Sequence, residues 1–209
     1  MSEAPGGPRL YLVTPSRPGL GRFPDLLGRL LDAHEIACVR LGVSGVDAEA
    51  VARAADTLRP VCHERDVPLV IAEHFRLVRP LGLDGVHLGD GSRNLRTARA
   101  EVGADGIVGA HARASRHDGM TAAEIGADYV SFGPLSASSL GDGSLAPPEL
   151  FAWWSEMIEV PVVAEGGLTP DLVSALADTA DFLALGEELW SAPEGPEAAL
   201  ATFVERLDG

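Results

Sequence analysis

Lysine is missing from this chain of 209 residues, because all 16 of its basic residues are arginines. Without lysine the protein cannot form a Schiff base with a carbonyl substrate, and it cannot supply the lysine of a P-loop. A lysine clamp on a pyrophosphate is excluded for the same reason. Contacts to an anionic ligand must then come from arginine or from backbone N–H groups.

Cysteine and long apolar runs are also scarce. Cys38 and Cys62 are far apart and show no metal-ligand spacing, so both are expected to be reduced thiols. No apolar run approaches the ~18 residues of a membrane span, and residues 1–8 lack the basic stretch of a signal peptide. The net charge of −15 disfavours nucleic acid and anionic membranes as partners. We expect a cytoplasmic protein that acts on a small molecule, and a homodimer is compatible with the sequence.

Short apolar runs alternate along the chain with segments of helical period. Eight of these runs are bounded by Gly, Pro or Asp and are almost continuously apolar, which is typical of parallel strands buried on both faces. The expected strands are 9–14, 36–41, 69–72, 85–88, 106–109, 129–133, 160–164 and 182–185. The expected helices are 23–34, 47–65, 75–81, 95–102, 116–125, 148–158, 170–178 and 195–207.

These repeated strand–helix units show no break in composition. They predict an α/β fold, a single (β/α)8 TIM barrel domain over residues 1–209, with a flexible N-terminus at 1–8. A doubly wound open sheet is the alternative, because strand order cannot be read from a sequence. The longest flexible stretch expected is the loop 136–147, which follows the sixth strand.

In such a barrel the chemistry lies where the strands end and the following loops begin. Gly166-Gly167 and Gly186 follow the last two strands, at the usual position of a phosphate in this architecture. Arg40 lies inside an apolar strand and needs a partner. It is either part of a structural ion pair with a strand-end acid such as Glu73, or an anion-binding guanidinium.

Four ionisable side chains at strand ends are candidates for catalysis or metal binding. His111 is an acid–base candidate, whereas His87 lies within its strand and is expected to be a hydrogen-bonded core residue. Glu73, Asp90, His111 and Glu165 could face one cavity, where their oxygen and nitrogen atoms would allow a metal site. Glu165 also raises a question, because a carboxylate at the rim of a glycine turn is unexpected in an anion site.

Three blocks point to a family: LGLDGVHLGDGS at 81–92, IGADYVSFGPL at 125–135 and VPVVAEGGLTPDLV at 160–173. In their order and spacing the chain resembles the thiamine phosphate synthase family, which includes the related thiazole tautomerase. The resemblance runs from about Leu10 to the end of the eighth strand, and it implies a (β/α)8 barrel. It also implies a reaction that joins hydroxymethylpyrimidine pyrophosphate to thiazole phosphate, with magnesium-bound pyrophosphate as the leaving group.

The resemblance transfers only part of the family's site to this chain. Arg40 is the one residue kept from the strand-two motif Gln-Leu-Arg-x-Lys. Glu73 keeps the acidic class of the family's first magnesium ligand, and Asp90 lies two residues before the position of the second. His111 and Arg113 align with the family's Ser and His after strand five.

At the phosphate end, Gly166 and Gly167 are kept, and Gly133 belongs to the family's FGP block. Glu165 replaces an apolar residue, and Glu187 replaces a serine that helps to hold phosphate in the family. The residues expected to bind substrate and phosphate are Arg40, Arg113, Gly133, Gly166, Gly167 and Gly186.

Three hypotheses follow. The first is a thiamine phosphate synthase-like transferase of thiamine biosynthesis with a strongly altered site, in which Glu73 and Asp90 hold magnesium and Arg40 binds pyrophosphate. The second is a metal-free isomerase of the thiazole tautomerase kind, with His111 or Glu165 as the base. The third is a catalytically inactive barrel that binds a small ligand.

Overall fold

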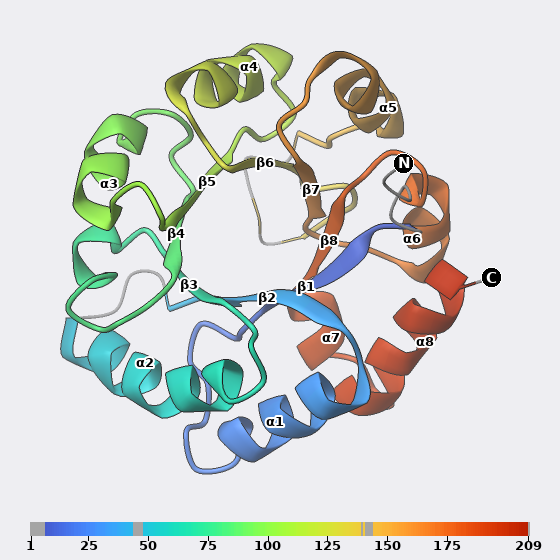
Figure 1. The fold of residues 1–209 in the computed structure, drawn as a ribbon. Helices are drawn as coiled ribbons and strands as arrows, with labels where there is room; N and C mark the ends of the chain where they lie inside the picture. The colour runs from blue at the N-terminus through green and yellow to red at the C-terminus, as the bar shows by residue number, and fades with distance from the viewer. Residues whose placement is uncertain (1–6, 44–47, 139, 141–143, 209) are drawn as a thin grey trace, which may run out of the picture.

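The computed structural model describes residues 7–43, 48–138, 140 and 144–208 and forms a closed barrel of parallel strands (Figure 1). The strands are β1 (Arg9–Val13), β2 (Ile36–Leu41), β3 (Leu69–Ala72), β4 (Gly85–Leu88), β5 (Ile107–His111), β6 (Tyr129–Phe132), β7 (Val162–Glu165) and β8 (Phe182–Leu185). Each strand pairs with the next, and β8 closes onto β1. The predicted TIM barrel is therefore confirmed, and the open sheet is wrong.

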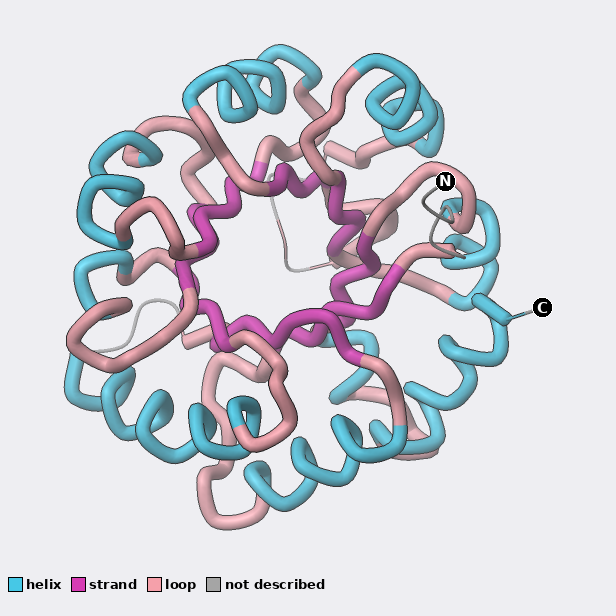
Figure 2. Tube along the Cα trace, viewed as in Figure 1, coloured by secondary structure: helices cyan, strands magenta, loops and turns pink. Residues whose placement is uncertain are grey.

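The helices surround the ring of strands, and loops join the two layers (Figure 2). They are α1 (Phe23–Ala33), α2 (Ala48–His63), α3 (Leu95–Val102), α4 (Arg116–Ile125), α5 (Pro148–Met157), α6 (Pro170–Leu176), α7 (Glu187–Trp190) and α8 (Pro196–Asp208). None of the described helices is both long and apolar enough to span a membrane.

Two local expectations are wrong. The helix expected at 75–81 is only the 3-10 turn η1 (Phe75–Leu77), because Pro80 has no N–H to donate and disfavours helical backbone before it. The short helix α7 was not among the helices expected from the sequence. In addition, β5 extends to His111 and β7 to Glu165, so both side chains project from the strands themselves.

Some expectations fall partly outside the described residues. They concern residues 1–6 of the expected flexible N-terminus, residue 47 of the second expected helix, and residues 139 and 141–143 of the loop 136–147. The described Pro8 is buried, and the described part of that loop forms no helix or strand.

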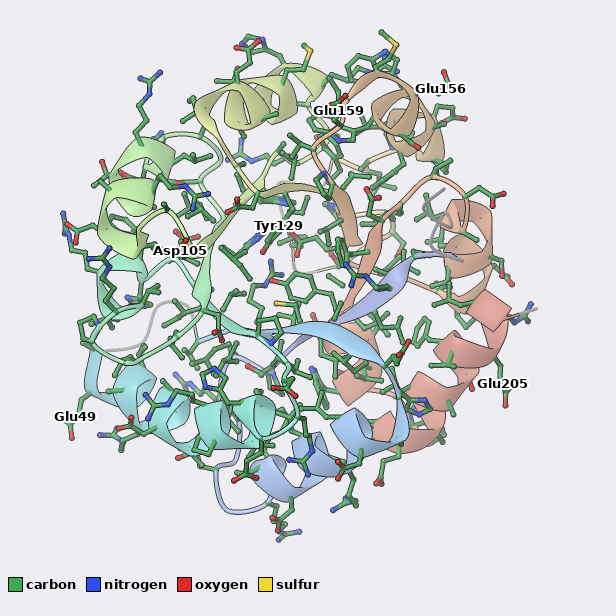
Figure 3. All side chains as sticks on the ribbon, in the orientation of Figure 1. Glu49, Asp105, Tyr129, Glu156, Glu159 and Glu205 are labelled. Carbon is green, nitrogen blue, oxygen red and sulfur yellow. The ribbon has the colours of Figure 1, made fainter. Side chains whose placement is uncertain are left out.

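The apolar core has two parts. The larger part lies between the strands and the helices, and the smaller part fills the inside of the barrel. The inner cluster consists of Tyr11, Cys38, Val70, Tyr129, Val163 and Ala184. Figure 3 shows Tyr129 inside the ring of strands, with Glu49, Glu156 and Glu205 on the outer surface. Gly109 makes room for the Tyr129 ring, which a Cβ at that position would overlap.

The inner cluster positions the functional layer above it. Side chains of a strand alternate between its faces, so the residues two positions further along also point inward. For Cys38, Tyr129 and Val163 these residues are Arg40, Ser131 and Glu165. A polar layer therefore covers the apolar one, toward the C-terminal ends of the strands.

Candidate active site

The C-terminal ends of the strands surround a cavity of about 910 Å³. Its lining includes six of the residues predicted from the sequence: Arg40, Glu73, His111, Arg113, Glu165 and Gly186. The position agrees with the rule that barrel enzymes carry their chemistry at this end. The polar layer inside the barrel forms the floor of this cavity.

Glu165 is the centre of the floor, and its side chain is only 3% exposed. Its Oε2 pairs with the guanidinium of Arg40 from β2. Its Oε1 accepts a hydrogen bond from the Ser131 hydroxyl at 2.6 Å and lies 2.9 Å from His111 Nδ1. His87 Nε2 lies 3.4 Å from the same oxygen. Several strands thus direct donors at one buried carboxylate.

A chain of hydrogen bonds lies below this carboxylate and ends at His87, which contacts it. The hydroxyls of Tyr11 and Tyr129 are 2.9 Å apart, and the Tyr129 hydroxyl is 2.9 Å from His87 Nδ1. Because the ionised Glu165 can only accept, the His87 proton belongs on Nε2, and Nδ1 accepts from Tyr129. The chain therefore runs in one direction, from Tyr11 through Tyr129 and His87 to Glu165. Both tyrosines also line a separate cavity of about 230 Å³ at the N-terminal ends of the strands.

The charges of the floor follow from these contacts. Burial would raise the pKa of Glu165, but Arg40 and the two histidines lower it more, so the pKa lies well below its usual value. Burial would lower the pKa of Arg40, but Glu165 together with Tyr11 and Tyr129 raises it more. Burial and the nearby Arg40 lower the pKa of His87 to about 4. At neutral pH the floor holds a charged Arg40–Glu165 pair beside a neutral His87.

Two atoms of this layer are buried without a hydrogen-bond partner, namely Arg40 Nη1 and His111 Nε2. Both residues line the cavity. In the neutral ring of His111 a proton on Nδ1 faces the carboxylate, and Nε2 is then a hydrogen-bond acceptor. Glu165 has its donors already in place. The sequence offered His111 and Glu165 as candidate bases. Only His111 has a buried side-chain atom that lacks a hydrogen-bond partner.

The ion-pair partner of Arg40 differs from the one considered from the sequence. Glu73, which follows β3, adopts a left-handed backbone conformation with φ of 64° and is exposed. Its Oε1 accepts from the Gly89 N–H at 2.7 Å. Glu165, on the opposite side of the barrel, takes its place beside Arg40. Arg40 therefore forms the buried ion pair that was expected, but its partner is Glu165 and not Glu73.

Magnesium prefers oxygen ligands and uses one or two carboxylates together with water and substrate phosphates. Glu73 lines the cavity, whereas Asp90 is not part of its lining. Asp90 Oδ2 accepts from Asn94 at 2.8 Å, and its Oδ1 is buried without a partner. The unpartnered Oδ1 and the exposed Glu73 carboxylate fit a hard cation in donor type.

A second metal-type cluster lies in the floor, where His87, His111 and Glu165 hold their ligand atoms within 4.8 Å of one another. Two imidazoles and a carboxylate suit zinc and its neighbours rather than magnesium. The Arg40 guanidinium bound to Glu165 opposes any added cation there. The cluster therefore does not fit magnesium.

The glycine turns after β7 and β8 line a smaller cavity of about 140 Å³. Gly166 and Gly167 have φ of 87° and 71°, which only glycine adopts without strain. Glu165, Glu187 and Glu188 line the same space, with Arg40 as the only cation among the described lining residues. The two glycine turns therefore form the predicted phosphate cradle, but carboxylates line it.

Glu188 has an unusual position in this cradle. The backbone N–H groups of Leu168, Gly186 and Glu188 itself stabilise its ionised carboxyl, yet burial raises the pKa more than they lower it. Its Oε1 is buried without a partner. An internal carboxylate thus lies among backbone donors of the kind that bind phosphate in barrels.

The other two predicted residues lie apart from the floor. Arg113 has φ of 53°, lines the cavity and is exposed, and its guanidinium has no ion pair or hydrogen bond within the described residues. Gly133 is buried and packs against β7, where a Cβ would collide with the carbonyl oxygen of Glu165.

Sequence reasoning missed Ser131 and Glu188. The signal for Ser131 was the period of two in YVSF, which places it on the same face as Tyr129. The signal for Glu188 was its place directly after the eighth strand, but the short helix α7 that orients it was not expected. His87 is the hydrogen-bonded core residue that was expected, but it also lines the cavity.

The chain matches the family described as thiamine monophosphate synthase over residues 10–189. It is 43% identical to a thiamine-phosphate synthase of Rhodospirillum centenum, over 96% of this chain and 98% of that one. A thiamine-phosphate synthase of Erythrobacter litoralis is 38% identical, over 99% of both chains.

Solved structures agree on the fold. A thiamine phosphate pyrophosphorylase from Pyrococcus furiosus matches with a TM-score of 0.82 and 21% identity, over 96% of this chain and 95% of that one. A geranylgeranylglyceryl phosphate synthase from Thermoplasma acidophilum matches with a TM-score of 0.71 and 16% identity, over 97% and 94%. The match over residues 10–189 covers nearly every side chain of the cavity, and by it the chain belongs to the thiamine monophosphate synthase family.

Proposed function

We propose that this protein is a thiamine phosphate synthase, a transferase that joins hydroxymethylpyrimidine pyrophosphate to thiazole phosphate and releases pyrophosphate. The observation that carries the proposal is the 43% identity to a protein of that name along almost the whole of both chains. The cavity at the strand ends supports it, because its lining combines arginines, histidines and a glycine turn. Such a reaction depends on positioning and charge neutralisation more than on covalent chemistry by the protein.

Within this proposal the pyrophosphate contacts Arg113, whose guanidinium is exposed and has no polar partner among the residues that the structure describes. Arg40 is less suited to that role than the sequence indicated, because Glu165 neutralises it. Glu73 and Asp90 would hold a magnesium ion, which would neutralise charge on the leaving group. Gly166, Gly167 and Gly186 lie where the thiazole phosphate is expected.

Thiamine phosphate formation from the two substrates with magnesium tests this function, with chromatography of the product as the readout. Arg113→Ala should lower kcat/KM about tenfold or more, because a charge-assisted contact to the leaving group is lost. Arg96→Ala, an exposed arginine on α3, is the matched control and should keep full activity. Absence of product at saturating substrate would exclude the synthase.

The magnesium ligands can be tested without turnover. Manganese binding followed by electron paramagnetic resonance, in the presence of pyrophosphate, should weaken in Glu73→Gln. Glu101→Gln, on the outer face of α3, should leave it unchanged. Equal binding by all three proteins would remove Glu73 from the proposed site.

A metal-free isomerase of the thiazole tautomerase kind is the second candidate. His111 Nε2 supports it, because this nitrogen has no partner and its ring is oriented by Glu165. Conversion of thiazole carboxylate tautomers in the presence of a chelator would support this activity, provided that His111→Ala abolishes it. A rate equal to the uncatalysed one would exclude it.

The proposal also includes a single-domain enzyme in the cytoplasm. Two free, buried cysteines support a reducing compartment, and burial raises the pKa of both thiols to about 12. A homodimer stays a prediction from the sequence, which light scattering on the purified protein would decide.

A further inference from the structure

A second cavity, of about 230 Å³, lies at the N-terminal ends of the strands, and no step of the proposed reaction takes place in it. Arg9, Ile107, Tyr129 and Phe182 line it, and they are the first residues of β1, β5, β6 and β8. None of the described residues that line this lower cavity also lines the large cavity at the other end of the barrel. The lower cavity is therefore a separate candidate for ligand binding.

The walls of the lower cavity are apolar and uncharged. Ile107, Val163 and Phe182 supply aliphatic and aromatic surface, and the buried rings of Tyr11 and Tyr129 complete it. Burial raises the pKa of both tyrosines, so their hydroxyls stay neutral. An apolar protein cavity of ~150 Å³ is large enough to bind benzene. The volume and the walls of the lower cavity therefore suit a single six-membered ring.

Two charged residues, Arg9 and Asp128, line the lower cavity, and both are exposed. The Asp128 carboxylate accepts hydrogen bonds from Arg99 and from the Val108 N–H. The Arg9 side chain has no ion pair or hydrogen bond within the described residues, and its guanidinium lies 4.7 Å from the centre of the Phe182 ring. Among the described lining residues, Arg9 therefore supplies the charge that no other side chain neutralises.

We propose that the lower cavity binds a small aromatic carboxylate, with its ring between the apolar walls and its carboxylate at the mouth against Arg9. A planar carboxylate matches the fork of guanidinium donors, which can contact both of its oxygens. A phosphate ester fits less well, because its second negative charge finds no further cation in the described lining and lies near Asp128. The inference goes beyond the proposed reaction and does not depend on it.

Titration of the full chain with two probes, followed by nuclear magnetic resonance of its methyl groups, tests the inference. One probe is benzoate, and the other is benzamide, which has nearly the same shape and no charge. Both should shift the methyl resonances of Ile107 and Val163, because both rings enter the lower cavity. Benzoate should bind about fivefold more tightly, which is the scale of an ion pair at a solvent-exposed position.

Variants separate the charge of Arg9 from the shape of the cavity. Arg9→Gln keeps a hydrogen-bond donor without the charge, so the preference for benzoate should fall to within about twofold while benzamide still binds. Ile107→Phe fills the cavity and should weaken both probes together. Arg116→Gln is the matched control, because Arg116 is exposed, lies 4.5 Å from the centre of the Trp153 ring and does not line the lower cavity. It should keep the native preference.

The large cavity is the alternative site for benzoate, because the exposed Arg113 lines it. Arg113→Gln should leave the affinities for both probes unchanged. Loss of benzoate binding in this variant would place the probe in the large cavity and overturn the inference. Equal binding of the two probes by the native protein, methyl resonances of Ile107 and Val163 that do not shift, or an unchanged preference in Arg9→Gln would also overturn it. The ratio of the two affinities does not depend on the fraction of folded protein.

Discussion

Arg40 on β2 and Glu165 on β7 form an ion pair across the inside of the barrel, with side chains that are only 9% and 3% exposed. A second ion pair, Arg29–Glu197, joins α1 to α8 with side chains that are 58% and 56% exposed. The two pairs have the same chemistry in different surroundings. Removing one charge should therefore have very different consequences in the two places.

Glu165→Gln should lower the free energy of unfolding by about 3–5 kcal/mol, because it leaves the Arg40 charge buried without its partner. Glu197→Gln, the matched control, should cost no more than about 1 kcal/mol. Urea unfolding of both variants measures the difference. Arg40→Met combined with Glu165→Gln should be more stable than Glu165→Gln alone, and a double variant as unstable as the sum of the single changes would contradict this reasoning.

His87 should make the protein less stable as the pH falls. The pKa of His87 is lowered to about 4 in the folded protein, while the ordinary pKa of a histidine is 6.5. Between these values the unfolded chain binds a proton that the folded chain does not, so stability is lost as the pH falls through this window. The contribution of His87 between pH 7 and pH 5 is about 2 kcal/mol.

Urea unfolding at the two pH values, in the native protein and in His87→Gln, isolates this contribution. The variant should show a smaller loss of stability than the native protein, whereas His117→Gln should show the native loss. The lowered pKa of Glu165 acts in the same direction, but its effect begins only below about pH 4.5. Identical pH dependence in the native protein and His87→Gln would show that His87 is not held neutral.

Gly133→Ala should destabilise the protein by about 3 kcal/mol or more, at the upper end of overpacking effects. The new Cβ would collide with the carbonyl oxygen of Glu165 and force the end of β7 to move. Gly19→Ala is the control, because nothing lies within 4 Å of its added Cβ. The midpoints of thermal unfolding of the two variants are compared. Equal midpoints would mean that the end of β7 moves away from the added Cβ at little cost in stability.

Glu188→Gln should strengthen the binding of an inorganic anion at the glycine turns. The change removes one of the three carboxylates that line this small cavity, and like-charge repulsion falls accordingly. Sulfate is the suitable probe, because its own charge does not change near neutral pH. A gain of about threefold or more in affinity is expected, since about 1 kcal/mol is the scale of one such contact even when water screens it fully.

Nuclear magnetic resonance titration, with shifts at Gly166 and Gly167, locates the bound sulfate. Glu194→Gln, an exposed carboxylate shortly after α7, should leave the affinity unchanged. If Glu188→Gln binds sulfate no better than the native protein, the carboxylate does not compete for the cradle.

The fold was predictable because buried parallel strands read as apolar runs. The bounds of β2, β3, β4 and β8 match those expected from the sequence. The ends of β5 and β7 were placed too early, because His111 and Glu165 are polar and were taken to begin loops. Polar residues are tolerated at those positions because the inward face of the barrel supplies partners for them.

The sequence predicted which residues lie in the site better than it predicted which of them contact one another. Strand ends identified Arg40, His111 and Glu165 individually, since the barrel rule alone brings them to one end. Their contacts depend on strand stagger and on which side chains point inward, and neither follows from spacing along the chain. The match of Arg40 with Glu165 instead of Glu73 is the clearest case.

The chain of contacts from Tyr11 to Glu165, which is hydrogen-bonded as far as His87, links the two halves of the barrel interior. In barrels of this class the loop-bearing end usually evolves for chemistry while the opposite end is left to maintain the scaffold. Here that division of labour is incomplete. Tyr11 does not line the large cavity, yet its hydroxyl is the first member of a relay of donors that fixes how His87 faces the carboxylate. Homologues or designed variants that exchange the lower layer will therefore also alter the chemistry above it.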